Sequence, residues 1–600
     1  MRLNMVIAIL CLVGHPVMLS ADPPGMSSME AEYDPLDIGP TEQRFLTQLI
    51  RRTLEAKVAN QPPYHPEYVP PALIDTKSQM VVTLRIDGYA RGIGVSLLNP
   101  IVEAAQEAAL VALSSAHSSM DGATFRLDDV LIDAQVLGRT KSFHSTQGGW
   151  MTPGAVENFI DPGLDGIGLF LDGERRWCTP SELIARGVSV RQAIKTLGKE
   201  ITIDSRSLAL AKLSKFRTLH WWESEIGGEI HALQRGMTYV PMQQVTADGL
   251  AQSIDQISDY LIYRQRPDGT FAFRYDPAAD SYAADEDEIA QSGAIWALAI
   301  HASASDSASA EAALQRSIRA RRELMIDLPD VENAAFLQTP DLKNQLGATA
   351  QFCLALADAP NPKLTANIRE QLANAIIWLQ NPNGRFITTF PPNRDLEGED
   401  VAPGQAVLAL VRCYELNPTQ KLLDAIDKAF PIYQDRYERV GSPAMIPWHM
   451  QAYSRMARLT KQSKYRDFAF RMADQVCDHQ IVSNNRDARM LVGAIAAPGI
   501  LPANAATAAM LSGLTEAAKL AKETGDTKRY DRYTEACRLA ARFVMQLQVR
   551  KEECFFVRSQ PDTVNGIRTS PIDWRIRIDN CQHALIGLTK ARQTLFANPS

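Results

Sequence analysis

The sequence has 600 residues, more than one hydrophobic core usually organises, so two or more domains are expected. Apolar residues make up 46% and charged residues 22%, which is the balance of a folded protein rather than a disordered one. The 62 Lys and Arg residues against 69 Asp and Glu give a formal charge of −7. That charge disfavours a dedicated nucleic-acid-binding protein, which needs a basic face. No stretch after the N-terminus reaches 18 apolar residues, which excludes a protein with several membrane spans.

The first residues are typical of a secretory signal peptide. Arg2 supplies the positive charge, and the apolar run 5–14 follows it. We predict a signal peptide over 1–21, and therefore a secreted or periplasmic protein. The residues before the expected cleavage point are large, so an uncleaved membrane anchor stays an alternative. Residues 22–40 are rich in Pro, Gly and Ser and are expected to form a flexible lead.

The N-terminal half reads as a mixed α/β (α+β) module over 41–222, followed by a linker over 223–244. Apolar residues at a spacing of three to four predict a helix that begins at Thr41. From Met80 the period changes to two, which predicts a half-buried strand that ends at the turn of Asp87 and Gly88. The same reasoning predicts helices over 101–116 and 190–197 and strands over 130–137 and 166–171.

Part of this module resembles the AMMECR family. The strand 81–88 leads into the box Arg91-Gly92-Ile93-Gly94, where the family has a similar strand and a Leu-Arg-Gly-Cys-Ile-Gly box. The stretch 166–173 and the turn at 178–180 fall where the family has a strand pair and a Pro-containing turn. The box cysteine is missing here. The resemblance implies a fold more than an activity, and a strained turn with a capping cation is the structural alternative for the box.

The C-terminal half, 245–600, predicts an all-α domain of about six helical hairpins. Its segments carry apolar residues at i, i+3 and i+4, and short loops rich in Pro, Gly and Asn separate them. The absence of a heptad register argues against a coiled coil and favours a closed or stacked array of helix pairs. The expected helices are 245–265, 286–302, 308–325, 343–358, 363–379, 402–416, 418–435, 444–460, 463–479, 501–523, 526–548 and 577–595.

Two loops of this half repeat each other. One is QRPDGTF from Gln265 to Phe271, and the other is QNPNGRF from Gln380 to Phe386. Each has a tight Asp-Gly or Asn-Gly turn, and its Phe can fold back over the helix end. Such loops resemble the hairpin ends of α/α-toroid proteins, the six-hairpin glycosidase-like and terpenoid-cyclase-like folds. The resemblance implies a toroid; it does not fix an activity, because toroids support hydrolases, lyases, epimerases and cyclases.

An acidic and aromatic loop is the first candidate site. Closely spaced carboxylates can share a proton, which raises one pKa enough to supply a general acid, and the aromatic rings can stack on a sugar. We expect Asp285 or Asp287 to donate the proton. The alternative is that these carboxylates only cap the following helix and face solvent. The expected substrate-binding residues of this loop are Tyr275, Asp276 and Tyr282.

A second candidate site lies near the C-terminus. Asp579 and His583 are four residues apart, which places both on one helix face, and Arg577 precedes them. This resembles the Arg-x-Asp-x-x-x-His pattern of toroid proteins related to glucuronyl epimerases and lyases. It implies Arg577 as an anion clamp and His583 as a base that Asp579 orients. A purely structural Asp579–His583 pair is the alternative.

Trp448 and His449 begin another expected inner helix and are candidate ligand contacts. No metal or other cofactor is expected, because the sequence has no zinc spacing, phosphate loop or dinucleotide fingerprint. The sequence thus predicts an exported protein that binds a carbohydrate or another small molecule, and neither nucleic acid nor a membrane beyond the possible anchor. Hydrolase, lyase and epimerase chemistry on an acidic polysaccharide all stay open. A non-catalytic toroid that binds a glycan or a protein is the rival prediction.

Overall fold

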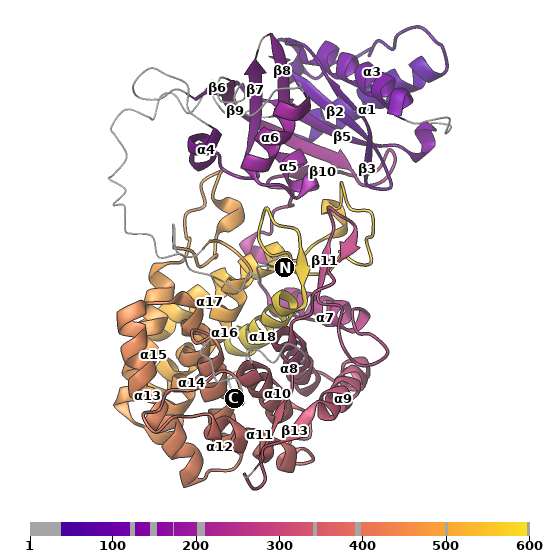
Figure 1. The fold of residues 1–600 in the computed structure, drawn as a ribbon. Helices are drawn as coiled ribbons and strands as arrows, with labels where there is room; N and C mark the ends of the chain where they lie inside the picture. Colours follow the sequence, from indigo (N-terminus) through magenta and orange to yellow (C-terminus); the bar gives the residue numbers. More distant parts are fainter. Residues whose placement is uncertain are drawn as a thin grey trace.

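The computed structural model describes residues 38–119, 126–143, 153–171, 173–200, 211–329, 331–339, 345–390, 398–497 and 502–596. The expected signal peptide and most of the lead lie outside these ranges. The described chain forms an N-terminal α/β domain and a larger helical domain (Figure 1). This is the fold class predicted from the sequence. Of the described helices, none is both long enough and apolar enough to cross a bilayer.

The N-terminal domain is built on a curled antiparallel sheet with the order β3-β2-β5-β9-β7-β8, to which β6 and β10 add by pairing with β9. Its strands are β2 (Met80–Ile86), β3 (Tyr89–Val95), β5 (Leu131–Leu137), β6 (Lys141–Ser142), β7 (Asp165–Leu171), β8 (Glu174–Cys178), β9 (Lys212–Glu223) and β10 (Ile230–Leu233); the short pair β1 (Lys77–Ser78) and β4 (Asn99–Pro100) stands apart.

Helices cover this sheet in two groups. The helices α1 (Pro40–Val58) and α3 (Ile101–Ser119) pack over β2, β3 and β5, and one buried apolar cluster joins them. A second cluster lies beneath the other half of the sheet. The remaining helices are α2 (Pro71–Ile74), α4 (Pro153–Val156), α5 (Pro180–Arg186) and α6 (Val190–Glu200).

The glycines of the Arg91–Gly94 box have a packing function. Gly92 and Gly94 lie in β3, where a Cβ on either would collide with the carbonyl oxygen of Ala112 or Ala108 in α3. The box therefore lets a strand approach an alanine-rich helix closely. The box lies within β3, where the pairing with β2 shifts register at Arg91, so the turn alternative is wrong. Arg91 stacks on Tyr89, with 4.7 Å from its guanidinium carbon to the ring centroid.

The strand β9 is the centre of the sheet, yet the periodicity predicted no strand there. It pairs with β5 at one end and β7 at the other, so it joins the two halves of the domain. Its partner β10 lies inside the span 223–244, which the sequence predicted as a linker. The sheet therefore extends into that span.

The helical domain is a closed ring of six hairpins. The inner helices α8, α10, α12, α14, α16 and α18 contact one another in that order, and α18 contacts α8 to close the ring. All twelve helices predicted from the sequence are present. Their bounds are α7 (Ala247–Tyr263), α8 (Glu288–Ala304), α9 (Ala308–Glu323), α10 (Gln345–Asp358), α11 (Ala366–Trp378), α12 (Ala402–Leu416), α13 (Gln420–Val440), α14 (Ile446–Thr460), α15 (Ser463–Asp478), α16 (Ala506–Thr524), α17 (Thr527–Leu547) and α18 (Ile578–Phe596).

The inner and outer helices differ in composition for a physical reason. The inner helices are surrounded by other helices and are buried almost all round, whereas the outer helices have one apolar face and one charged face. Each outer helix runs back antiparallel to the inner helix before it. The inner helices therefore all point the same way, and their N-termini meet at one end of the ring, which we call the mouth.

The glutamine loops form a repeat that closes the ring. Gln265, Gln380, Gln480 and Gln548 each follow an outer helix, and each makes an isolated β-bridge to an apolar residue later in its loop. The side-chain amide of each also donates to a backbone carbonyl of the next-but-one helix around the ring. The last of them bonds to Ser253 O in α7 and joins the end of the ring to its beginning. The sequence showed two of these loops, and the structure has four.

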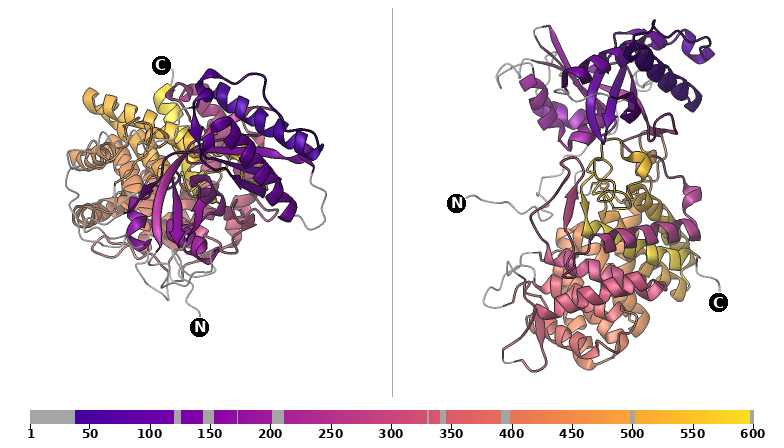
Figure 2. Two further views of the ribbon diagram at one scale, coloured as in Figure 1. Left: turned by 90° about the horizontal axis from the view of Figure 1, so that it is seen from above. Right: turned by 90° about the vertical axis from the view of Figure 1, so that its right-hand side faces the viewer.

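The N-terminal domain is stacked on the mouth end of the ring (Figure 2). Trp222 of β9 donates to Glu552 O at 2.8 Å, and the Arg558 guanidinium stacks on Tyr89 at 4.8 Å. Gly88 has a positive φ of 77° and abuts the backbone of Val557. The long loop between α17 and α18 is thus the main support of the N-terminal domain.

Candidate functional site at the mouth of the helical ring

The mouth brings together residues that are almost 300 positions apart in the sequence. Asp287 is the N-cap of α8, and its side chain accepts from Ala290 N at 3.0 Å. Asp579 and His583 lie in the first two turns of α18, which neighbours α8 in the ring. Both candidate sites predicted from the sequence therefore contribute residues to the same end of the helical ring.

Arg577 and Asp579 form a two-point ion pair. The guanidinium Nε and Nη2 donate to the two carboxylate oxygens at 2.8 and 2.7 Å. Arg577 lies in β15 (Ile576–Arg577), which pairs with β11 (Arg274–Asp276), and its guanidinium also stacks on Phe273 at 5.1 Å. The residue predicted to clamp a substrate anion thus holds a carboxylate of the protein itself in this structure. Its role toward a substrate stays a prediction.

Asp287 has the electrostatics of a proton donor. Burial raises the pKa of its carboxyl group, and the nearby negative charge of Asp579 raises it further, while Arg577 opposes the shift. Two carboxyl groups with different surroundings therefore lie near enough at the mouth to influence each other electrostatically. One is paired with a cation, and the other is pushed toward its protonated form.

His583 lies beside this pair and is partly exposed. Burial lowers the pKa of its imidazole, and Arg577 adds to this, although Asp579 opposes it. Among the hydrogen bonds of the described residues, none joins Asp579 to His583, since the carboxylate is occupied by Arg577. A neutral imidazole at this position can accept a proton at neutral pH.

Two tryptophans form a floor beneath these residues. Trp448 of α14 makes an edge contact with His583, with 5.7 Å between ring centroids. Trp448 also reaches Trp296 of α8 at 6.1 Å. Because α8 and α14 are opposite each other in a ring of six, this contact crosses the ring axis. The two indole rings therefore meet in the middle of the ring, next to His583.

Below the floor lies a layer of charged residues, of which Glu516 and Lys590 are buried and the others are partly buried. Asp358 accepts from the indole of Trp296 at 2.7 Å, and Lys590 donates to the amide oxygen of Gln451 at 2.6 Å. Although burial opposes it, Arg455 and other cations hold the pKa of Glu516 well below its usual range. Burial lowers the pKa of Lys590 to about 7. Ion pairs link the layer across α10, α12, α14, α16 and α18. It consists of Asp358, Arg412, Glu415, Arg455, Arg458, Glu516 and Lys590.

The other candidates of the acidic loop have local partners. Tyr275 is buried, and its hydroxyl donates to Asp280 at 2.5 Å. Tyr282 is half exposed and donates to Asp562. Asp276 accepts from the backbone of its own turn, and the exposed Asp285 pairs with Arg274 at 3.1 Å. These residues border the mouth through the β11–β15 pairing. A structural role alone also explains the contacts that they make.

His449 lies inside the wall of the ring. It is 1% exposed and is stacked between Tyr433 and Tyr453, with centroids at 5.2 and 5.7 Å. Burial lowers the pKa of its imidazole to about 3. These contacts place it away from the mouth, so a ligand contact for His449 has no support in this geometry.

Several residues inside the ring were missed by sequence reasoning. Trp296 looks like an ordinary member of a helical pattern, and only the ring closure shows that it reaches the interior. A usable signal was present for the charged layer, because Asp358, Glu516 and Lys590 are ionisable residues at otherwise apolar positions of inner helices.

Comparisons with known proteins are consistent with the two-part fold. No family model matches the chain, and no curated protein matches its sequence. Among solved structures, an uncharacterised protein from Pyrococcus horikoshii is 19% identical, covers 33% of this chain and 98% of its own, and has a TM-score of 0.28. An unsaturated glucuronyl hydrolase specific for heparin is 12% identical, covers 58% of this chain and 100% of its own, and has a TM-score of 0.41.

An α-1,6-mannanase from a Salegentibacter species is 10% identical, covers 58% of this chain and 99% of its own, and has a TM-score of 0.42. An inactive variant of that mannanase was solved in complex with α-1,6-mannotriose. The resemblances inferred from the sequence, to the AMMECR family and to six-hairpin toroid proteins, implied the fold that the structure has, an α/β domain followed by a closed ring of six helical hairpins. Their identities and scores carry no activity over to this chain, and the toroid assignment rests on its closed ring of helices.

Proposed function

We propose that this protein is an exported carbohydrate-active protein that carries out proton-transfer chemistry on an acidic glycan in the mouth of its helical ring. The observation that carries the proposal is the pair Asp287 and Asp579, two carboxyl groups near each other in unlike surroundings. Glycan-cleaving and sugar-epimerising chemistries both need a proton donor and a proton acceptor close together.

The proposed roles follow from the surroundings of each group. Asp287 is the proton donor, because its raised pKa keeps it protonated to higher pH than an exposed aspartate. His583 is the acceptor, since its lowered pKa leaves the imidazole neutral. Arg577 is the anion contact, and it would exchange Asp579 for a substrate carboxylate or hold both.

Asp287 is a better proton donor than Asp285. The sequence alone gave no reason to prefer either residue for this role. Asp285 is exposed and paired with Arg274, whereas Asp287 lies near the Arg577–Asp579 pair. The two residues therefore provide a matched experiment. Asp287→Asn keeps the helix cap, because Asn caps a helix as well as Asp, and it removes the acid. Asp285→Asn makes the same chemical change two residues away.

The test is a turnover screen on purified residues 22–600 with neutral and uronate-containing oligosaccharides. Three readouts separate the reaction types: new reducing ends for hydrolysis, ultraviolet absorbance of a new C=C bond for elimination, and deuterium uptake from solvent for epimerisation. We expect turnover to fall about 100-fold or more in Asp287→Asn and in His583→Gln, and to stay near wild type in Asp285→Asn. Turnover should also fall on the alkaline side as Asp287 loses its proton. Equal turnover in wild type and Asp287→Asn would contradict the assignment.

The rival function, glycan binding without chemistry, has one observation in its favour. Arg577 already has a two-point partner in Asp579, so the mouth is electrostatically satisfied without a substrate. Oligosaccharide binding that Asp287→Asn and His583→Gln both retain, with no turnover in wild type, would favour this function.

Export is a separate part of the proposal and rests on the N-terminal segment. Fractionation of cells that express the full chain tests it.

A further inference from the structure

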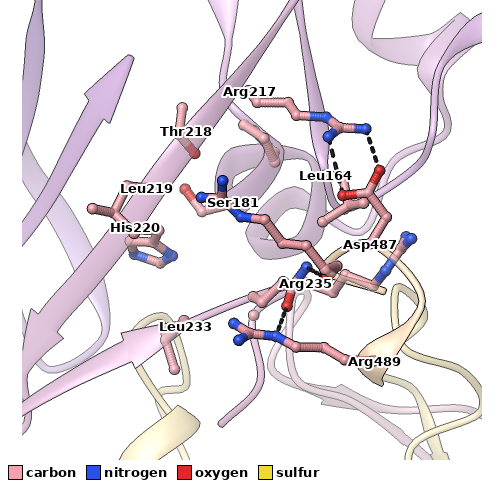
Figure 3. Close-up of a pocket in the computed structure, with 15 residues that line it drawn as sticks. Leu164, Ser181, Arg217, Thr218, Leu219, His220, Leu233, Arg235, Asp487 and Arg489 are labelled. Carbon is pink, nitrogen blue, oxygen red and sulfur yellow. Dashed lines mark hydrogen bonds and ion pairs between the residues drawn. The ribbon is translucent and has the colours of Figure 1, made fainter. Parts of the chain in front are cut away.

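A cavity of about 70 Å³ lies between the two domains, apart from the mouth. One wall belongs to the N-terminal domain, from Leu164, β9 and the turn after β10, and the other to the loop between α15 and α16 (Figure 3). A water-sized group needs roughly 10 to 15 Å³ of such space, so the cavity has room for several waters or one small polyatomic ion.

Arginine dominates its lining. Arg217 and Arg235 come from the N-terminal domain, and Arg486 and Arg489 come from the helical domain. Among the described lining residues, Asp487 is the one carboxylate. The remaining lining side chains are apolar or neutral, apart from His220. Asp161 and Asp165 lie behind the lining and pair with Arg235 and Arg217, so four guanidinium groups meet three carboxylates around this space.

Asp487 shows how a two-oxygen acid group is bound here. Its oxygens accept from Nη1 and Nη2 of Arg217 at 3.0 and 2.7 Å, which is the forked geometry of an arginine–oxyanion contact (Figure 3). This pair links the two domains directly. Arg217 also contacts Asp165 through Nε at 3.3 Å.

Arg235 is built into the cavity wall at a conformational cost. It has a positive φ of 55° at a turn position where Gly or Asn is usual. Its two terminal nitrogens bind Asp161 at 2.7 and 2.9 Å, while its Nε is buried and has no hydrogen-bond partner within the described part of the chain. A buried donor without a partner is rare and is expected to have a ligand or water in solution.

Arg489 provides the link from the other side. Its Nε donates to the amide oxygen of Gln234 at 2.5 Å, and the Gln234 amide nitrogen donates to Arg486 O at 2.8 Å. Arg489 is exposed at the rim of the cavity. The turn that carries Arg235 is thus fastened to the segment that carries Arg486 and Arg489.

We infer that this junction binds a tetrahedral oxyanion, sulfate or phosphate, either free or as a substituent of a sugar. Such a group has the size of the cavity and accepts several charge-assisted hydrogen bonds from arginines of both domains. Bound there, it would join the two domains and stabilise their stacking. The inference depends on residues other than those of the mouth, so it stands or falls separately from the proposed function.

The test is calorimetric titration of the full protein with sodium sulfate, sodium phosphate and a sulfated monosaccharide, each at constant ionic strength set by sodium chloride. The unsulfated monosaccharide is the ligand control. We expect binding of sulfate or phosphate that weakens about tenfold or more in Arg235→Gln and in Arg489→Gln. Arg439→Gln, an exposed arginine of α13 paired with Asp435, is the matched control and should bind as wild type does.

Asp487→Asn separates loss of a ligand contact from loss of folding. It removes the carboxylate that competes for Arg217, so anion binding should become several-fold tighter. A sulfated sugar that binds more tightly than free sulfate identifies a sugar substituent as the ligand, and equal binding identifies the free ion. Titrations in which sulfate and phosphate act no differently from chloride, or in which Arg489→Gln and Arg439→Gln bind alike, would overturn the inference.

Discussion

The indole rings of Trp296 and Trp448 meet inside the helical ring, with their centroids 6.1 Å apart and their planes inclined by 31°. The two residues come from opposite inner helices, and both are nearly fully buried. Their contact lies between His583 at the mouth, which touches Trp448, and Asp358 of the charged layer, which accepts from Trp296. It therefore closes the middle of the ring.

The floor should be a major contributor to the stability of the ring. We expect Trp448→Ala to lower the free energy of unfolding by about 3 to 5 kcal/mol, because it leaves a large cavity among fixed helices. Trp378→Ala, in the partly exposed outer helix α11, is the control and should have a smaller effect. Urea denaturation followed by circular dichroism measures both. Equal losses in the two variants would mean that the floor collapses around the missing ring.

The helical ring was predictable because its signal is local. Each hairpin has an apolar period of its own, and turn residues such as those at Gln265 and Gln380 mark where the helices end. The strand β9 was not predictable in this way. One end of β9 pairs with β5 and the other with β7. Lys215 and Arg217 pair with Asp165 and interrupt the alternation of apolar and polar residues along the strand. Tertiary pairing overrides the local pattern there.

The site was predictable residue by residue but not as an arrangement. The i, i+4 spacing places Asp579 and His583 on one helix face, but it cannot show that Arg577 takes the carboxylate first. Nor can it show that Asp287 neighbours them, because that depends on the contact between α8 and α18 that closes the ring. The interdomain cavity depends on pairs such as Arg217 and Asp487, 270 positions apart, which leave no local pattern.

His449 makes the ring sensitive to acid. Its pKa is about 3 in the folded protein, against about 6.5 for a free histidine, because burial disfavours the charged imidazole. Between these values the unfolded chain binds a proton that the folded chain does not. The contribution of His449 is therefore complete above pH 6.5 and is lost as the pH falls toward 3.

We expect wild type to lose up to about 1.4 kcal/mol of stability per pH unit relative to His449→Gln across that window. Urea midpoints at several pH values between 7 and 4 measure the difference. His65→Gln, at an exposed position, is the control and should follow the wild-type curve. If the stability of wild type and of His449→Gln changed in parallel with pH, protonation of His449 would cost the folded protein no stability.

The junction between the domains depends on a buried ion pair. Arg568 and Glu553 are both fully buried and bound to each other, and Glu553 also accepts from the backbone N–H of Thr238 at 3.0 Å. Glu553→Gln leaves the Arg568 charge without a counter-ion and should destabilise the protein by about 3 to 5 kcal/mol. The double variant Glu553→Gln with Arg568→Met removes both charges and should recover much of that loss.

Thermal unfolding and urea denaturation of the single and double variants test this expectation. Asp435→Asn, which breaks the exposed pair with Arg439, is the control and should change stability by less than about 1 kcal/mol. If the double variant is as unstable as Glu553→Gln, the loss comes from the hydrogen bonds to Thr238 and not from the uncompensated charge.

Lys590 should make the stability of the protein depend on pH at neutral to alkaline values, whereas His449 acts at acidic values. Burial lowers its pKa to about 7, against about 10.4 for an exposed lysine, even though Glu516 opposes the shift. Between these values the unfolded chain keeps the proton and the folded chain releases it. Folding in this range therefore costs the free energy of deprotonating Lys590. That cost shrinks as the pH rises from about 7 toward 10, so stability should rise relative to a variant without the amine. We expect wild type to gain up to about 1.4 kcal/mol per pH unit over Lys590→Met, measured as urea midpoints at pH 7, 8 and 9.

Lys522→Met, at an exposed position of α16, should show no such change. A constant difference between wild type and Lys590→Met across this range would mean that Lys590 stays charged beside Glu516, and that the layer is held as a fully ionised network.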